Sequence, residues 1–212
     1  MDENIERLSE LVREPQLTMI GAPPTINAEA FAQQLLGGAI FYSGAHLRGV
    51  ELHANNKAVE YREKRFLFNL QNVFAFNYDD DDPICSEARE YDYCMWSIKE
   101  NYSRDLKASV IVLADFTKNA YNTPADLSSF TGNARLVYTA DAVLAMQKFQ
   151  NAIRVSCLKA PWNNYAAWKE PLIDFFVEYE PESRAFHEVP APEVSPLEDL
   201  NHINTRKRSA RK

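Results

Sequence analysis

Short apolar segments alternate with amphipathic segments along most of the chain. Ser109–Leu113 (SVIVL) is rich in β-branched residues, which is typical of a strand buried on both faces of a sheet. Asn4–Glu14 carries apolar residues three or four positions apart, which predicts a helix with one buried face. Further strands are expected at Leu17–Ile20, Ala39–Tyr42, Val73–Phe76, Ala142–Met146, Ile153–Leu158 and Phe175–Tyr179, whereas Phe66–Leu70 fits either a strand or a helix end. The alternation predicts an α/β fold with a largely parallel sheet.

The chain divides into three parts. Residues 1–14 form a helix that either packs on its own domain or docks as an arm on a neighbouring subunit, and Pro15 ends it. Residues 15–189 form a single core domain. Residues 190–212 are rich in proline and charge and poor in core residues, so we expect a disordered tail with a basic end.

Composition narrows the class of protein. A chain of 212 residues that is 46% hydrophobic and 12% aromatic is long enough for one globular domain with a sizeable core. Because it has no long apolar run and begins with an acidic segment, neither a membrane span nor a signal peptide is expected. Three cysteines without metal-ligand spacing favour reduced thiols and a cytoplasmic location. A net charge of −7 argues against nucleic-acid binding over the whole surface but allows a local basic patch.

Gln16–Leu36 has the layout of a phosphate-binding P-loop, a buried strand followed by a loop rich in Gly, Pro and Asn and then an amphipathic helix. The Gly-Lys-Ser/Thr that should close the loop is replaced by Asn27, Ala28 and Glu29. Ala28 removes the ammonium that would reach the phosphates, and Glu29 places a carboxylate where a metal-binding hydroxyl belongs. A carboxylate at a helix N-terminus contributes roughly 0.3–1 kcal/mol. The sequence therefore predicts a helix end that is stable by itself and repels an anion.

Six segments, in this order, resemble the RecA-fold ATPase domain of DnaB-type replicative helicases and their phage and plasmid relatives. The resemblance covers about residues 15–189 and implies a RecA-like fold of the P-loop NTPase type, with a mostly parallel sheet flanked by helices in a single domain. The matching segments are Leu17–Leu36 (Walker A), Gly38–Leu52 (the second strand), Val73–Tyr78 (Walker B), Val110–Asn119 (the γ-phosphate-sensing strand), Asp126–Met146 (the DNA loop and the strand after it), and Val155–Asn164 with Phe175–Val189 (the Lys-x-Arg finger and the final hairpin).

The resemblance also implies a nucleotide site whose polar residues have been replaced. Ala45 stands at the position of the water-activating glutamate, Asn77 at that of the Walker B aspartate, and Asp115 at that of the phosphate-sensing glutamine. In the finger, Lys159 remains but Pro161 replaces the arginine. Phosphoryl transfer depends on positioning and charge neutralisation, so we expect no ATP turnover and no catalytic residue. The expected degenerate site comprises Gly21, Thr25, Asn27, Ala28, Glu29, Ala45, Asn77, Asp115 and Lys159.

Two other groups of residues can be interpreted either as functional sites or as ordinary structural features. The acidic run Asp79–Asp82 could attract a divalent cation, but it lacks the ligand spacing of a calcium loop and also fits a solvated turn. Cys157 and His46 could form a thiol nucleophile with its base, but Cys157 lies in an apolar strand and also fits a buried structural cysteine. No metal site is therefore predicted.

Aromatic and basic residues suggest contacts with DNA. Pro161–Trp168 (PWNNYAAW) fits a surface that stacks single-stranded bases, a part of the core, or a subunit interface. The subunit interface is included because the resemblance places this region opposite a neighbouring nucleotide site. The loop Asp126–Arg135 and the basic tail could contact phosphates or simply be solvated. The candidate DNA-binding residues are Asn133, Arg135, Arg206, Lys207, Arg208, Arg211 and Lys212.

Three functional hypotheses follow. The first is a pseudo-ATPase without cofactor that acts in DNA replication or recombination, in a phage, plasmid or other mobile element, by binding copies of itself, a helicase-type protein or single-stranded DNA, and no membrane. The second is an active ATPase or DNA helicase that binds ATP and Mg²⁺ in a divergent site, in which Lys159 or Asp79–Asp82 compensates for the lost groups. The third is an interaction module with no DNA role.

Overall fold

The computed structural model describes residues 2–43, 64–70, 95–96, 98–121, 123–130, 134–169 and 173–193, with backbone only for 40–43 and 134–136. Eight strands form one sheet in the order β2-β3-β4-β1-β5-β6-β7-β8. The strands from β2 to β5 in this order are parallel, and β5 to β8 are antiparallel neighbours. Their bounds are β1 (Gln16–Ala22), β2 (Ile40–Ser43), β3 (Arg65–Asn69), β4 (Ser109–Asp115), β5 (Ala142–Phe149), β6 (Ala152–Lys159), β7 (Asp174–Glu180) and β8 (Ala185–Val189).

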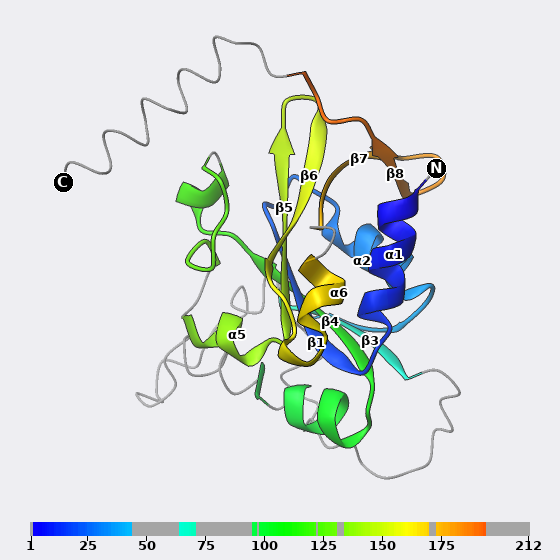
Figure 1. Ribbon diagram of the computed structural model, residues 1–212, viewed down its shortest axis with the longest axis vertical. Coiled ribbons are helices and arrows are strands. Elements are labelled where there is room, and N and C mark those ends of the chain that lie inside the picture. The colour runs from blue at the N-terminus through cyan, green and yellow to red at the C-terminus, as the bar shows by residue number, and fades with distance from the viewer. Residues whose placement is uncertain are drawn as a thin grey trace, which may run out of the picture.

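Helices cover both faces of this sheet (Figure 1). One face carries α1 (Glu3–Val12), α2 (Ala28–Leu36) and α6 (Tyr165–Lys169), whose apolar side chains share a core cluster with β7 and β8. The π-helix η2 (Lys99–Asp105) and α5 (Ala134–Thr139) contribute to the cluster on the other face. Two short 3-10 helices, η3 (Lys118–Tyr121) and η4 (Trp162–Asn164), complete the described elements. The result is the predicted α/β domain, in which β1 and β4 are buried on both faces.

The predicted elements within the described residues form where the pattern places them. β4 covers the predicted strand Ser109–Leu113 and ends at Asp115. The ambiguous segment Phe66–Leu70 is strand β3, which pairs in parallel with β4. The predicted strand Val73–Phe76 lies outside the described residues.

The first helix packs on its own chain. Its buried side chains Ile5, Leu8 and Val12 belong to the core cluster that contains α2. Ser9 Oγ donates to the carbonyl oxygen of Leu35 at 2.5 Å, and Arg13 Nε donates to the same oxygen at 3.0 Å. In this chain α1 is therefore part of the core domain.

The outer edge of β8, the last strand of the described sheet, is occupied by side chains. The Gln34 amide of α2 accepts the backbone N–H of Phe186 at 2.7 Å and donates to its carbonyl at 2.9 Å, as a neighbouring strand would. The Asp2 carboxylate accepts the N–H of Glu188 at 2.9 Å, which helps to hold the pKa of Asp2 below its usual value. Bonds of this kind keep the strand edge from pairing with another chain.

Candidate functional site

The loop between β1 and α2 is shorter than the sequence pattern predicts. Gly21 and Ala22 still belong to β1, so the expected loop from Gly21 reduces to Pro23–Asn27. A Cβ atom on Gly21 would lie 2.3 Å from carbon atoms of both Phe116 and Phe130. Gly21 therefore leaves the space in which the rings of Phe116 and Phe130 pack, on the face of the sheet opposite α2. The prediction that Gly21 begins the phosphate loop is wrong, because it is still part of β1.

The loop is closed on itself by hydrogen bonds. Ile26 donates its N–H to the carbonyl of Pro23 at 3.0 Å, and Ala28 donates to that of Ile26 at 2.8 Å. The Asn27 side chain accepts the N–H of Ala30 at 3.1 Å and so caps α2. Pro23 and Pro24 have no N–H to offer. Several backbone donors that a phosphate-binding loop would present are therefore absent or already bonded within the loop.

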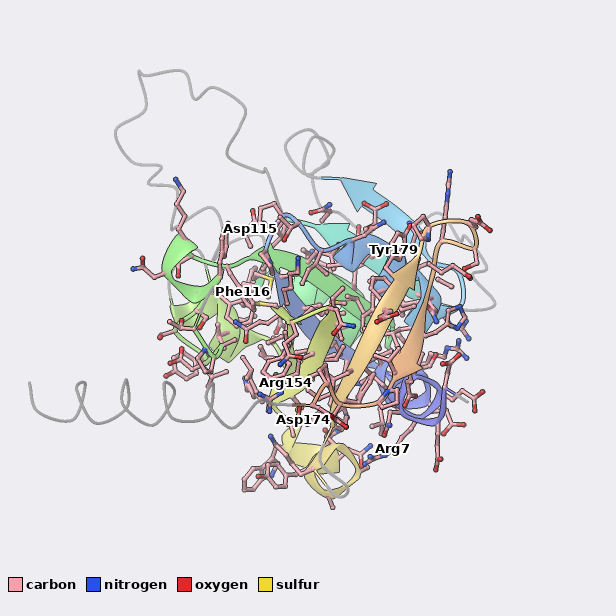
Figure 2. The ribbon with its side chains drawn as sticks, turned by 90° about the horizontal axis from the view of Figure 1, so that it is seen from above. Arg7, Asp115, Phe116, Arg154, Asp174 and Tyr179 are labelled. Atoms are coloured by element: carbon pink, nitrogen blue, oxygen red, sulfur yellow. The ribbon has the colours of Figure 1, made fainter. Side chains whose placement is uncertain are left out.

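Carboxylates flank this loop at the carboxyl edge of the parallel strands. Asp115 ends β4 directly opposite Ala22, the last residue of β1, and its half-buried position is labelled in Figure 2. Glu29 lies in the first turn of α2 and accepts a hydrogen bond from Gln33 at 3.2 Å. Ala28 is buried and Thr25 is exposed. The loop itself, Pro23–Asn27, contains no lysine or arginine.

β3 ends at the same edge with Asn69, which pairs with Leu113 of β4 and with Ser43 of β2. The resemblance in sequence assigns the Walker B strand to Val73–Tyr78 and its aspartate position to Asn77, both outside the described residues. Among the described strands, however, β3 is the one between β2 and β4. The polar residue beside the end of β4 is consequently the amide of Asn69.

Lys159 lies at the opposite end of the strands from the β1–α2 loop. It pairs with Val143 near the start of β5, and β5 runs parallel to β1. Its ammonium donates to the carbonyl oxygens of Val137, Tyr138 and Ala140, at 3.1, 3.0 and 2.5 Å, at the end of α5. Burial lowers the pKa of Lys159, and the nearby Asp141 carboxylate opposes that shift. Lys159 caps α5 and does not reach the β1–α2 loop of its own chain.

Solved structures of an ATPase domain and of a recombinase match the fold of this chain. The ATPase domain matches with a TM-score of 0.55 at 11% identity, over 87% of this chain and 90% of that chain. The RadB recombinase matches with a TM-score of 0.56 at 11% identity, over 84% of this chain and 92% of that chain. The chain has a RecA-like fold. The predicted resemblance is thereby confirmed at the level of the fold, although no protein-family model and no curated sequence matches the chain.

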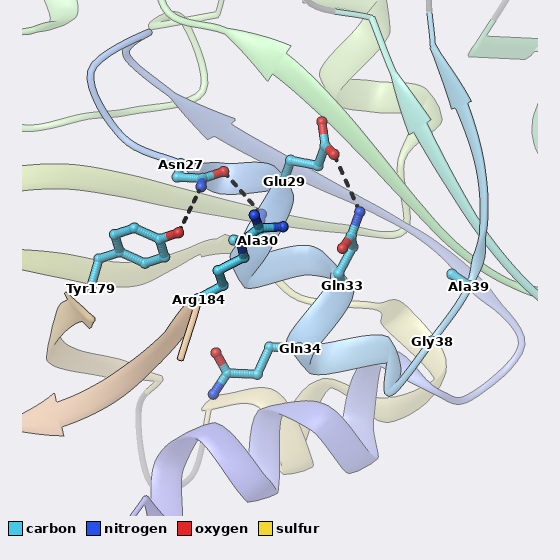
Figure 3. A pocket seen from close by; sticks show the side chains of 9 residues that line it. All are labelled: Asn27, Glu29, Ala30, Gln33, Gln34, Gly38, Ala39, Tyr179 and Arg184. Carbon is cyan, nitrogen blue, oxygen red and sulfur yellow. Dashed lines mark hydrogen bonds between the residues drawn. The ribbon is translucent and has the colours of Figure 1, made fainter. Parts of the chain in front are cut away.

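A cavity of about 560 Å³ lies along α2 of this RecA-like domain (Figure 3). Tyr179 and Arg184, from the end of β7 and the turn before β8, line it opposite the helix. Tyr179 Oη accepts a hydrogen bond from Asn27 Nδ2 at 3.3 Å, and the Arg184 side chain extends toward Ala30. Neither residue is predicted from the sequence, because nothing in the local pattern brings this turn to a helix that lies about 150 positions earlier. The remaining lining residues are Glu29, Gln33, Gln34, Gly38 and Ala39.

The other candidate residues are only partly placed. Ala45, Asn77, Asn133, His46, Asp79–Asp82 and the tail cations Arg206, Lys207, Arg208, Arg211 and Lys212 lie outside the described residues. Arg135 lies in α5, where only its backbone is described. Cys157 is buried and burial raises the pKa of its thiol, which agrees with a structural cysteine.

Metal ligands and membrane spans are both missing from the described part of the chain. No group of three or more His, Cys, Asp or Glu side chains in the described ranges is placed to hold a metal ion. Among the helices that the structure describes, none is long and apolar enough to cross a membrane.

Proposed function

We propose that the chain is a non-catalytic RecA-like protein that acts in DNA replication or recombination by binding DNA, copies of itself or a helicase-type protein. One observation carries the proposal. The loop after β1, where a RecA-like ATPase would bind phosphates, is closed by its own carbonyls and by the Asn27 side chain. A cytoplasmic location and the absence of a cofactor are part of this proposal.

The electrostatics at the loop support the proposal. ATP–Mg²⁺ binding and phosphoryl transfer need cations and donors that neutralise the phosphate oxygens. Here Ala28 provides no ammonium, and Glu29 adds a carboxylate in the first turn of α2. The loop thus lacks the lysine ammonium of an active ATPase, and Arg184, which extends toward Ala30, supplies a positive charge beside the helix rather than in the loop.

The cavity along α2 favours a second candidate, a divergent active ATPase. Its volume of about 560 Å³ is in the range of small-molecule sites, and Tyr179 and Arg184 could hold a planar ring. Lys159, which this hypothesis assigned a compensating role, bonds to the end of α5 at the other edge of the sheet. A nucleotide in the cavity would thus not be contacted by Lys159, the lysine of the finger motif, from the same chain.

We expect ATP–Mg²⁺ to leave the midpoint of thermal unfolding unchanged. Binding at 100 times Kd would add about 2.7 kcal/mol to the free energy of unfolding, which corresponds to a rise of roughly 5–10 °C for a chain of this size. Differential scanning fluorimetry over a series of ATP concentrations measures the shift.

Adenosine is the matched ligand for this experiment, because it has the ring and the ribose but no phosphate. A shift with both ligands would indicate binding in the cavity and would leave the closed loop irrelevant to it. A shift with ATP–Mg²⁺ alone would show that the loop accepts phosphates, and the proposal of a pseudo-ATPase would then be abandoned.

We expect the basic tail to supply phosphate contacts. Replacing Arg206, Lys207, Arg208, Arg211 and Lys212 by glutamine should weaken binding to a labelled single strand and flatten the dependence of log K on log[salt] by about 0.7 for each phosphate that is no longer neutralised. Fluorescence anisotropy across a salt series measures both. The control replaces Lys118 and Lys148, two exposed lysines of the folded domain, by glutamine. Equal slopes in the two variants would contradict a specific role of the tail.

A further inference from the structure

The segment Pro161–Lys169 presents two aromatic rings to solvent. Trp162 is 97% exposed and Tyr165 is 56% exposed. They lie three residues apart, in η4 and in the first turn of α6, so their side chains emerge about one helical turn apart. Burial of apolar surface is the main driving force of folding, so a tryptophan left almost fully exposed contributes little to it. Its role has to be sought outside the core.

The backbone that carries these rings is held firmly. Trp168, in the same segment, is fully buried in the core cluster beside α1. Lys169 Nζ donates to the carbonyl of Cys157 at 2.9 Å, and Arg7 Nη2 donates to that of Ala167 at 2.5 Å. Figure 1 shows α6 beside the sheet, and Figure 2 labels Arg7 close to it. The exposed rings therefore project from a fixed support, so ordering them on binding costs little entropy.

The charge around the rings differs from that of the whole chain. The protein has a net charge of −7, yet no acidic residue occurs from Pro161 to Lys169. Arg7 and Lys169 both donate to backbone carbonyls on the inner side of the segment, which holds the segment in place. The neighbouring side chains on the outer side are the amides of Asn163 and Asn164 and the small Ala166.

We propose that Trp162 and Tyr165 form a stacking surface for the bases of single-stranded nucleic acid. Exposed aromatic rings with amide side chains beside them match the two chemical parts of such a strand, because rings stack on the flat bases and amides donate to the phosphates. This inference rests on the proposed role in DNA metabolism and names the strand-binding surface within it.

The surroundings favour bases over a protein partner. The centre of a protein interface is a dry apolar patch in which aromatic anchors fill pockets. Here the neighbours of the two rings along the chain are the amides of Asn163 and Asn164 and the small Ala166, and both rings are exposed. Bases stack on a ring face without needing an apolar rim, because the phosphates stay in water.

The test measures binding of the full chain to a labelled oligo(dT) strand at low salt, by anisotropy and by quenching of tryptophan fluorescence. Trp162→Ala is expected to weaken binding roughly 5- to 150-fold, as for the loss of one stacked base, and Trp162→Phe to retain most of the affinity. Because Trp162 is exposed, neither substitution disturbs the core. Trp96→Ala is the matched control, because Trp96 is also exposed, at 56%, and lies in a different helical segment.

Each other outcome overturns the inference in a distinguishable way. Equal losses for W162A and W96A, or undiminished binding by W162A, would reject the stacking surface while leaving the proposed function intact, with the basic tail as the contact. No binding of oligo(dT) by the unaltered chain would reject both the inference and the DNA part of the proposed function. Loss of self-association in W162A, measured by light scattering and without any change in DNA binding, would assign the rings to a second copy instead.

Discussion

Replacing Gly21 by alanine should destabilise the fold by about 3 kcal/mol, at the upper end of the usual cost of overpacking a core. The new methyl group would lie 2.3 Å from ring carbons of both Phe116 and Phe130. These two rings are buried and pack edge to face with centroids 5.1 Å apart, so neither can move without disturbing the other. The free energy of unfolding from urea denaturation at equilibrium measures the loss.

The packing around Gly21 explains the size of the effect. In the sheet, Gly21 is flanked by Ala114 of β4 and Ala145 of β5, so three small residues in a row form a shallow trough across the strands. Phe116 and Phe130 belong to the same core cluster as these alanines and fill the trough. A methyl group in the middle of this trough would take up space that the two rings occupy.

A double variant distinguishes overpacking from other causes. Phe130→Leu removes ring atoms that the new methyl group would meet, so Gly21→Ala should cost less in the Phe130→Leu background, with a coupling free energy of about 0.5–3 kcal/mol. Additive losses would show that the rings do not cause the effect. A loss of less than about 0.5 kcal/mol for the single variant would contradict the close packing of the two rings on Gly21.

Much of the fold follows from local patterns. The strand before the loop and the first helix are readable from the sequence, because the periodicity of buried residues acts over a few positions. Gly37 adopts φ 64°, a conformation that suits glycine, and donates its N–H to the carbonyls of Gln33 and Gln34 at the end of α2. β4 is readable for another reason, since a central parallel strand has to be apolar on both faces.

Contacts between distant segments account for what the sequence could not predict. Phe66–Leu70 and Val73–Phe76 are similar apolar runs a few residues apart, and only tertiary pairing decides which of them lies beside β4. Gly21 has the sequence context of a loop glycine, but its packing partners come from Phe116 and Phe130, about 100 positions later. The cavity formed by Tyr179 and Arg184 arises in the same way.

Lys159 shows how a residue can match a motif and still have another role. A resemblance in sequence assigns it to a finger that acts on a nucleotide, whereas the structure shows its ammonium bonded to three carbonyl oxygens at the end of α5. The last carbonyls of a helix have no partner within the helix and carry partial negative charge. A lysine placed there stabilises the helix end.

Lys159→Met should therefore destabilise the fold by about 2–3 kcal/mol, because the part-buried bonds to the carbonyls of Val137 and Ala140 and the exposed bond to that of Tyr138 lose a charged donor while the apolar stem is kept. Equilibrium denaturation measures the change. Compared with the unaltered chain, the variant should show a larger increase in hydrogen exchange for the amides of α5 than for those of β4, because the cap acts on that helix. Lys148→Met is the control, since Lys148 is an exposed lysine on β5.

The same variant separates the cap from a role in an assembled nucleotide site. If Lys159 stabilises α5 alone, Lys159→Met lowers stability and leaves the response to ATP–Mg²⁺ as it is in the unaltered chain. Stability unchanged within about 0.5 kcal/mol would contradict the cap. An ATP-dependent stabilisation present in the unaltered chain and lost in the variant would instead return Lys159 to nucleotide binding across a subunit interface, because within one chain it lies at the edge of the sheet opposite the β1–α2 loop.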